Sequence, residues 1–136
     1  MITFRYKKER NRRGTEVYRP VAEVILENGE KSVAVSMYID SGADISMIPL
    51  SIGKALGFDQ RTEEIKEIKG IAGEAIPYII KEVGFKFPGY AFKGRIGWAL
   101  IEEVPLLLGR FDVFAKFKIV FDETEKFILF IPKHPA

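Results

Sequence analysis

The chain contains no cysteine, and this absence removes several kinds of site at once. A thiol nucleophile, a disulfide and a cysteine-bound zinc ion all require that residue. Histidine is nearly absent too, because His134 is the single example and lies third from the end. A Ser-His-Asp triad would need this tail residue at the centre of the fold, and no Gly-x-Ser-x-Gly elbow is present. Catalysis by thiol or triad, and transition-metal ligation, are therefore disfavoured.

Long apolar runs are also missing. No stretch approaches the roughly 20 apolar residues that span a bilayer, and Arg5 and Lys7 place charge where a signal peptide needs an apolar core. There is no Gly-x-x-x-x-Gly-Lys phosphate loop. We therefore expect a soluble, cytoplasmic protein that has no membrane partner and uses no cofactor.

The composition is that of one folded domain. With 136 residues, 47% hydrophobic and 12% aromatic, the chain can bury a substantial core. We expect a single domain over residues 1–136, with a basic N-terminal segment at 1–16 and a C-terminal hairpin and tail at 118–136. The net charge of +2 gives no general argument for nucleic acid.

Strand-like segments rich in Val, Ile, Tyr and Phe alternate with turn signals along the chain. The strongest signal is Asn28-Gly29, since both central residues of a tight hairpin turn must tolerate positive φ. The pattern predicts an all-β protein, a closed β-barrel with one or two short helices at 49–57 and 111–117. The expected strands are 3–7, 17–26, 32–39, 63–69, 75–82, 85–87, 90–101, 118–122 and 126–131.

Asp40 has the most unusual setting. The apolar residues 37–39 lead directly into Asp40, Ser41 and Gly42, and apolar residues resume at Ile45. A buried carboxylate is costly unless it is paired or its pKa is shifted. This framing indicates a chemical site.

Two chemistries use carboxylates without histidine or cysteine. Asp40 and Asp44 could together hold a hard cation, but Ca²⁺ sites usually gather more oxygen ligands from one loop, and apolar residues flank this one. We therefore expect no metal. Alternatively, two carboxyl groups that share a proton can activate a water molecule as a base while the protonated partner polarises a carbonyl.

The basic run at residues 7–13 has two interpretations. Clustered Lys and Arg can bind phosphates and would suit a nucleic-acid-binding barrel. No aromatic interleaving supports this, so we expect a solvated turn or arm and no nucleic-acid partner.

Three segments, in order, resemble the retropepsin-type aspartic proteases. Asp40-Ser41-Gly42-Ala43-Asp44 resembles the Asp-Thr/Ser-Gly-Ala-Asp signature of that family. Gly70-Ile71-Ala72-Gly73 is similar to the glycine-rich tip of its flap, and Leu107-Leu108-Gly109-Arg110 to the element beside its active-site loop. The matched elements extend from about residue 17 to residue 121.

The resemblance implies a role for each matched residue. Asp40 would be the catalytic carboxylate, and Ser41 would hydrogen-bond across two active-site loops. Gly42 and Asp44 would bind the substrate backbone, and Arg110 would pair with Asp44.

The remaining matched residues would close or support the site. The flap tip would cover the peptide with Gly70, Ile71, Ala72 and Gly73. Ala43 and Gly109 would be structural support for the loop.

The signature occurs once in this chain, whereas pepsin-like enzymes carry it twice. The resemblance therefore implies a homodimer whose two Asp40 residues form a dyad and share one proton. The predicted function is an aspartic endopeptidase that acts on a peptide or protein substrate. The alternative is a catalytically weak or inactive retropepsin-like module for dimerisation or peptide binding.

Overall fold

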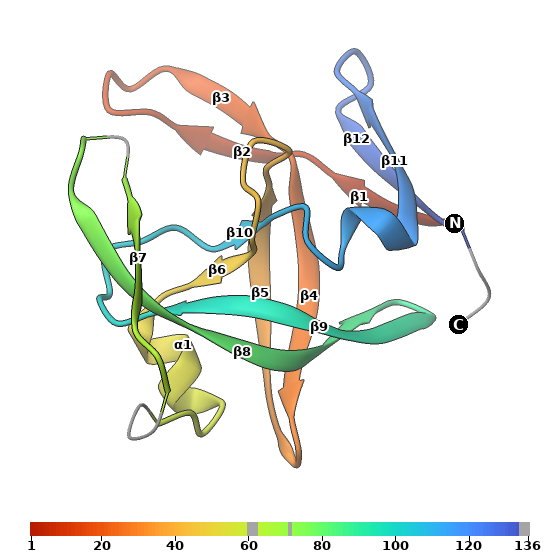
Figure 1. Ribbon diagram of the computed structural model, residues 1–136. Coiled ribbons are helices and arrows are strands. Elements are labelled where there is room, and N and C mark those ends of the chain that lie inside the picture. The colour runs from red at the N-terminus through yellow and green to blue at the C-terminus, as the bar shows by residue number, and fades with distance from the viewer. Residues whose placement is uncertain (60–62, 71, 134–136) are drawn as a thin grey trace.

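The computed structural model describes residues 1–59, 63–70 and 72–133, which are mostly strand (Figure 1). Within this part of the chain the largest sheet has seven strands, and their spatial order differs from their order in sequence. In spatial order they are β4 (Val21–Asn28), β5 (Lys31–Ile39), β10 (Leu107–Leu108), β6 (Met47–Ile48), β9 (Tyr90–Ala99), β8 (Ala75–Phe87) and β7 (Lys66–Lys69).

The seven-stranded sheet turns back on itself. β4 pairs with β8 as well as with β5, through Ile25 opposite Lys86 and Glu27 opposite Gly84. Strands predominate and helix is scarce, which confirms the all-β prediction. A closed barrel goes further than these pairings and stays a prediction.

The hairpin that Asn28-Gly29 predicted forms, but its turn is shifted by one residue. Asn28 pairs with Lys31, so the central residues of the turn are Gly29 and Glu30, and Asn28 does not take a positive φ. β4 and β5 pair over eight positions, and Gly29 has a φ of 61°. The expected strand 17–26 is wrong in one respect, because it is divided into β3 (Glu16–Arg19) and β4. Pro20 separates them, since proline has no N–H to give to a ladder.

Both ends of the described chain meet in a second sheet. β1 (Ile2–Arg5) pairs with β12 (Phe127–Pro132), which also pairs with β11 (Phe117–Asp122). The C-terminal hairpin predicted at 118–131 is thus confirmed, and it gains a third strand from the N-terminus.

The basic segment forms a third, two-stranded sheet. β2 (Lys7–Arg10) pairs only with β3 among the described strands. The sequence predicted a solvated turn or arm. The segment is exposed, but it forms a pair of strands. The predicted strand 3–7 ends instead at Arg5, before β2 begins at Lys7.

The helices are shorter than predicted. α1 spans Leu50–Ala55 and is followed by Gly57, whose φ of 80° suits the end of a helix. The helix predicted at 111–117 is wrong in extent, because only the 3₁₀ turn Phe114–Lys116 forms. Asp112 has a φ of 66°, and a left-handed residue cannot belong to a right-handed helix.

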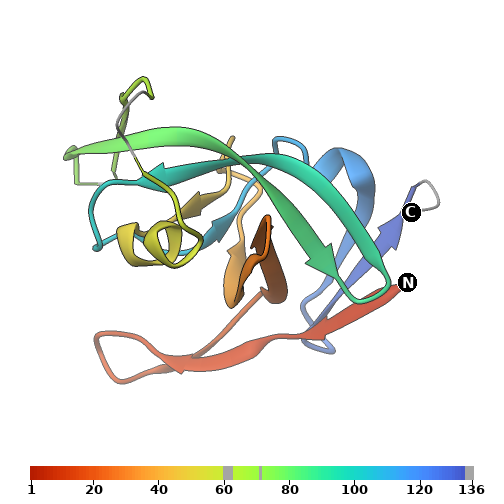
Figure 2. The same ribbon diagram turned by 90° about the horizontal axis from the view of Figure 1, so that it is seen from below.

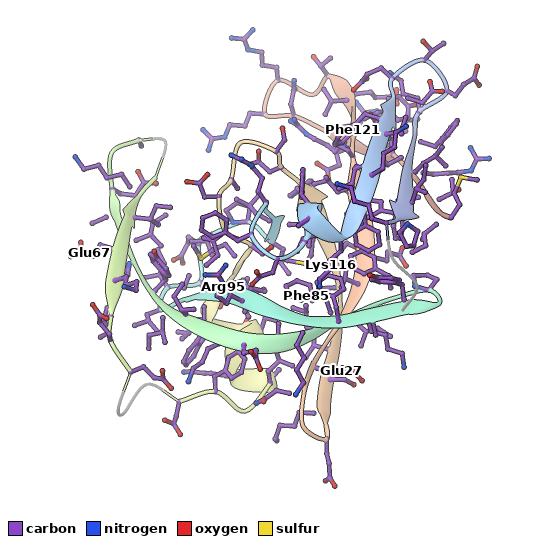
Figure 3. All side chains as sticks on the ribbon, turned by 45° about the vertical axis from the view of Figure 1, so that its right-hand side comes forward. Glu27, Glu67, Phe85, Arg95, Lys116 and Phe121 are labelled. Carbon is purple, nitrogen blue, oxygen red and sulfur yellow. The ribbon has the colours of Figure 1, made fainter. Side chains whose placement is uncertain are left out.

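β8 is one continuous strand of 13 residues where the sequence suggested two, at 75–82 and 85–87. Its pairing with β9 runs from Tyr78 to Phe87 without interruption. Beyond the body of the sheet it pairs with β7, whose four residues are all exposed. In Figure 3 Glu67 of β7 lies at the outer margin of the molecule, whereas Phe85 of β8 lies at its centre.

Aromatic rings from the two larger sheets form much of the core. Phe130 of β12 lies 5.4 Å from Phe4, 5.4 Å from Phe87 and 5.1 Å from Phe117, between ring centroids. Close tilted and edge-to-face contacts of this kind add to the free energy of burial. This cluster therefore joins the terminal sheet to the seven-stranded sheet. No helix in the described ranges is long and apolar enough to cross a membrane.

We expect Phe130→Ala to lower the free energy of unfolding by about 3–5 kcal/mol, because it leaves a cavity among aromatic rings. Phe121→Ala is the matched control, since Phe121 is 41% exposed. Its loss should be less than half as large. Urea unfolding of both variants measures the difference, and equal losses would contradict this account of the core.

Candidate active site

The segment from Asp40 to Ser46, here called the Asp40 loop, leaves the end of β5 and enters β6. β5 lies parallel to β10 at this end. The Tyr38 amide donates to the carbonyl of Leu106 at 2.9 Å, and the Asp40 amide donates to the carbonyl of Leu108 at 3.0 Å. The segment from Leu106 to Leu108, which ends in the buried Leu108, therefore fixes the backbone of Asp40.

The loop turns sharply around the Asp40 carboxylate. Its Oδ1 accepts a hydrogen bond from the Gly42 amide at 2.9 Å, and the Asp40 carbonyl accepts one from the Ala43 amide at 3.2 Å. A Cβ on Gly42 would lie 3.2 Å from Oδ1, which is tighter than most real contacts. Asp40 is half-buried, while Ser41 and Asp44 are exposed. The carboxylate is thus positioned by backbone and still reachable from outside.

The segment after β10 crosses directly beneath this loop. The amides of Arg110 and Phe111 donate to the carbonyls of Ala43 at 2.9 Å and Asp44 at 2.8 Å. A Cβ on Gly109 would lie 2.5 Å from the carbonyl carbon of Ile45 and 2.6 Å from its oxygen. Since both are backbone atoms, only glycine fits here without displacing the loop.

Ser46 also supports the loop, and the sequence analysis missed it. Its side chain is fully buried, and Oγ accepts a hydrogen bond from the Gly109 amide at 2.9 Å. Its carbonyl accepts one from the Gly97 amide of β9 at 2.7 Å. The sequence does contain a sign of this role, because Ser46 is a polar residue between the apolar Ile45 and Met47. A polar side chain that is buried with its neighbours needs a hydrogen-bond partner.

Arg110 and Asp44 form an ion pair across the same crossing. Arg110 Nη1 lies 3.6 Å from Asp44 Oδ1, and the two side chains are 58% and 71% exposed. An exposed pair of this kind contributes little to stability. Both side chains therefore remain accessible at the surface of the crossing.

A stronger pair fixes the turn that follows. The Arg95 backbone amide and Nε donate to Asp112 Oδ2 at 2.9 and 2.8 Å, and Nη2 donates to Oδ1 at 3.2 Å. Hydrogen bonding by Arg95 holds the pKa of Asp112 below its usual value. The guanidinium also lies 5.2 Å from the centre of the Phe111 ring. Arg95 therefore joins β9 to the segment that carries Gly109 and Arg110.

The predicted flap residues lie elsewhere, at the tip of the β7–β8 hairpin. The Gly70 amide donates to the Glu74 carbonyl at 2.8 Å, the Gly73 amide donates to the Gly70 carbonyl at 3.0 Å, and Gly73 has a φ of 85°. Ala72 is exposed, and Ile71 lies outside the described residues. In Figure 1 this tip and the Asp40 loop project on the same side of the molecule.

The structure thus brings the predicted site residues together in two groups. The Asp40 loop, Gly109 and Arg110 form one connected unit, and the hairpin tip forms another. Between described residues, no backbone hydrogen bond joins the two groups. In the same ranges no three His, Cys, Asp or Glu side chains gather in a way that could hold a metal ion.

Solved structures share this arrangement of strands. The EIAV protease complexed with the inhibitor HBY-793 matches with a TM-score of 0.56 and 25% identity, covering 71% of this chain and 86% of that one. A retropepsin-like aspartic protease from Rickettsia conorii matches with a TM-score of 0.67 and 19% identity over 95% of this chain and 99% of that one. No protein-family model matches the sequence, and the search of curated proteins finds no match.

The chain has the retropepsin fold. The retroviral protease-like domain of Ddi1 from Leishmania major is a third example, with a TM-score of 0.52 and 15% identity over 86% of this chain and 98% of that chain. The resemblance read from the three sequence segments is therefore confirmed.

In this retropepsin fold, Gly109→Ala should cost about 1–3 kcal/mol of stability and displace the Asp40 loop, because the new methyl meets backbone at Ile45. Gly84→Ala is the control, since its Cβ would meet Glu27 Cβ at an ordinary 3.4 Å. Thermal unfolding and the amide NMR shifts of Asp40 and Gly42 report the two effects. Equal behaviour of the two variants would contradict the crossing as described.

The Asp112–Arg95 pair predicts a pH dependence. Because the folded-state pKa of Asp112 is lowered, its contribution to stability is present above the unfolded pKa of about 3.9. It is lost as the pH falls through the lower folded value. Wild type should therefore be more stable than Asp112→Asn at pH 6, and the gap should narrow as the pH falls below about 3.9. A gap in urea midpoint that does not change with pH would exclude this role.

Proposed function

We propose that this chain is an aspartic endopeptidase, active as a homodimer in which two Asp40 residues form the catalytic dyad. The observation that carries the proposal is the Asp40 loop, which presents a half-buried carboxylate. The Gly42 amide donates to this carboxylate, and the Leu108 carbonyl holds the Asp40 backbone amide. The retropepsin fold supports the same conclusion.

The chemistry needs two carboxyl groups, and the chain supplies one signature. Two carboxyl groups at hydrogen-bonding distance cannot both lose their protons without a large energetic cost, so the two Asp40 residues share one proton. A C2 dimer places the same residue of each copy opposite its mate. One Asp40 would take a proton from water while the other, protonated, donates to the scissile carbonyl.

The reaction then proceeds through a tetrahedral intermediate. Water oxygen bonds to the carbonyl carbon, and its proton passes to the ionised Asp40. That proton is delivered to the amide nitrogen as the carbon–nitrogen bond breaks. The other Asp40, which gave its proton to the carbonyl oxygen, takes one back from a hydroxyl of the intermediate. A carboxyl and an amine product remain, and the dyad again shares one proton. Activity should fall once the pH is high enough to remove the shared proton.

Other residues of the site would position the peptide. The exposed backbone of Gly42 and the Asp44 side chain would bind the substrate main chain, with Arg110 holding Asp44 at 3.6 Å. Ser41 would bond across the two loops of the dimer.

The β7–β8 hairpin would act as a flap. Its tip residues Gly70, Ile71, Ala72 and Gly73 would cover the peptide and exclude water. The complete exposure of β7 supports this role, since a hairpin that packs against little else can move as a unit.

We expect Asp40→Asn to abolish cleavage of a peptide library while leaving the fold and the dimer intact, because the amide cannot act as a base. Asp122→Asn is the matched control, since its Oδ1 serves a turn by accepting from the Glu125 amide. Mass spectrometry of the products and sedimentation velocity provide the two readouts. Cleavage that persists in Asp40→Asn would refute the proposal.

The same experiment separates the alternative function. A dimerisation or peptide-binding module would bind peptides equally well before and after the Asp40→Asn change, and wild type would cleave none of them. A chain that stays monomeric at all concentrations would exclude the dyad.

A further inference from the structure

The β2–β3 hairpin has no part in the function proposed above. It pairs with no other strand of the described chain, and most of its residues are exposed. In Figure 1 it projects on the same side as the Asp40 loop, and Figure 2 shows it extending along one margin beyond the other strands. Because this hairpin covers no core, packing does not explain it, and a binding role is the next explanation to consider.

The hairpin has a strongly positive charge, and its acidic side chains neutralise only the basic residues that lie away from the turn. Residues 7–19 include six basic and two acidic side chains, a net charge of +4 against +2 for the whole chain. Both acidic side chains pair with basic residues outside the turn. Glu9 lies 3.9 Å from Lys7 and 3.8 Å from Arg19, and Glu16 lies 2.6 Å from Lys8.

The unpaired charge therefore gathers at the turn. Arg10, Arg12 and Arg13, here called the arginine tip, are exposed and form no ion pair with any described residue. Arginine is the side chain best suited to bind carboxylates, because its guanidinium donates two parallel hydrogen bonds.

The turn that carries the arginine tip is ordered. Asn11 Oδ1 accepts hydrogen bonds from the amides of Arg13 and Thr15, both at 3.0 Å, and Gly14 takes a φ of 79°. Arg10 Nη1 donates to the Gly14 carbonyl at 2.8 Å. A preformed turn loses less conformational entropy when a ligand binds.

A hydrogen bond connects this hairpin to the strand that delivers Asp40. Tyr38 donates its hydroxyl to Glu9 Oε2 at 2.7 Å, and this bond raises the pKa of the Tyr38 hydroxyl. Tyr38 lies two residues before Asp40. Arg10 follows Glu9 directly, and Arg13 is four residues beyond it. At roughly 3.3 Å per residue, the whole arginine tip lies within about 13 Å of Glu9. An extended peptide of about six residues covers roughly 20 Å.

We propose that the arginine tip binds acidic residues of the peptide substrate, outside the positions that contact the Asp40 loop. This inference rests on the proposed function, because it names the class of peptide that the same site would favour. A homodimer carries two such tips, one on each side of the dyad. Acidic residues about four to eight positions from the scissile bond, on either side, would therefore strengthen binding, at roughly 3.3 Å per extended residue.

Nucleic acid fits the hairpin less well. Binding of single strands relies on aromatic side chains between the basic ones, on which bases stack. Tyr18 is the aromatic residue of residues 7–19, and it lies away from the tip, with Lys126 Nζ 5.8 Å from its ring centre. The bond from Tyr38 to Glu9 ties the hairpin to the strand that leads into the Asp40 loop.

The test uses three peptides with one central sequence that the wild-type chain cleaves, chosen from a random library. They carry four Glu, four Gln or four Lys residues beginning five positions from the scissile bond. We expect the Glu peptide to have a KM about tenfold below that of the Gln peptide at low salt, with kcat unchanged. Added salt should remove the difference, because the contact is exposed.

Two variants with the same change in charge locate the effect. Arg10→Glu/Arg12→Glu/Arg13→Glu should abolish the preference for the Glu peptide and leave kcat/KM for the bare central sequence unchanged. Lys31→Glu/Lys86→Glu/Lys93→Glu, at three exposed lysines outside the hairpin, should keep the preference. The inference is overturned if the preference for the Glu peptide is absent in wild type or survives in the arginine variant. Neither result would contradict the proposed endopeptidase function.

Failure of the proposed function is distinguishable. If wild type cleaves none of the library, fluorescence anisotropy of labelled Glu and Gln versions of one library sequence tests the tip directly. Binding that needs Glu, falls with salt and requires the three arginines would support it, whereas equal binding would overturn it. A tip that binds a single-stranded oligonucleotide, with no effect on either peptide, would also overturn it in favour of nucleic acid.

Discussion

The rest of the structure depends on a place where two backbone segments touch with no side chain between them. Gly109 passes so close to the carbonyl of Ile45 that even one methyl group would collide with it. The buried Ser46 hydroxyl, which binds the Gly109 amide, holds the contact closed. Burying the Ser46 hydroxyl without a partner would be costly. The Gly109 amide can be that partner because Gly109 has no Cβ to hold the two segments apart.

This crossing connects elements that are far apart in sequence. β10 lies between β5 and β6 and so joins the strand before the Asp40 loop to the strand after it. Both ends of the loop are then held by one short strand of two residues. Arg95 adds a third attachment by binding Asp112 beyond the crossing. The position of the Asp40 carboxylate is therefore set by tertiary contacts rather than by the local turn alone.

Local signals were sufficient for some of this. The β4–β5 hairpin, the apolar run before Asp40 and the Gly-Arg segment each have a physical cause within a few residues, and each was predictable. The turn of that hairpin lies one residue later than Asn28-Gly29 predicted. Other features needed partners that a single sequence does not reveal. Ser46 becomes structural only when Gly109, which is 63 residues later in the sequence, lies against it. The helix predicted at 111–117 was too long for a similar reason. Asp112 has a left-handed φ and binds Arg95, which lies 17 residues earlier in the sequence.

The terminal sheet has a consequence for how the chain acquires its structure. β1 pairs with β12, so residues 2–5 have no partner strand until β12 has been synthesised. The β4–β5 hairpin, by contrast, closes over two residues and can form early. Contacts between distant segments are slow to form because the loop between them must be closed first. β1 would thus wait for β12 before it can pair, and its Phe4 would join the aromatic core in the last steps of folding.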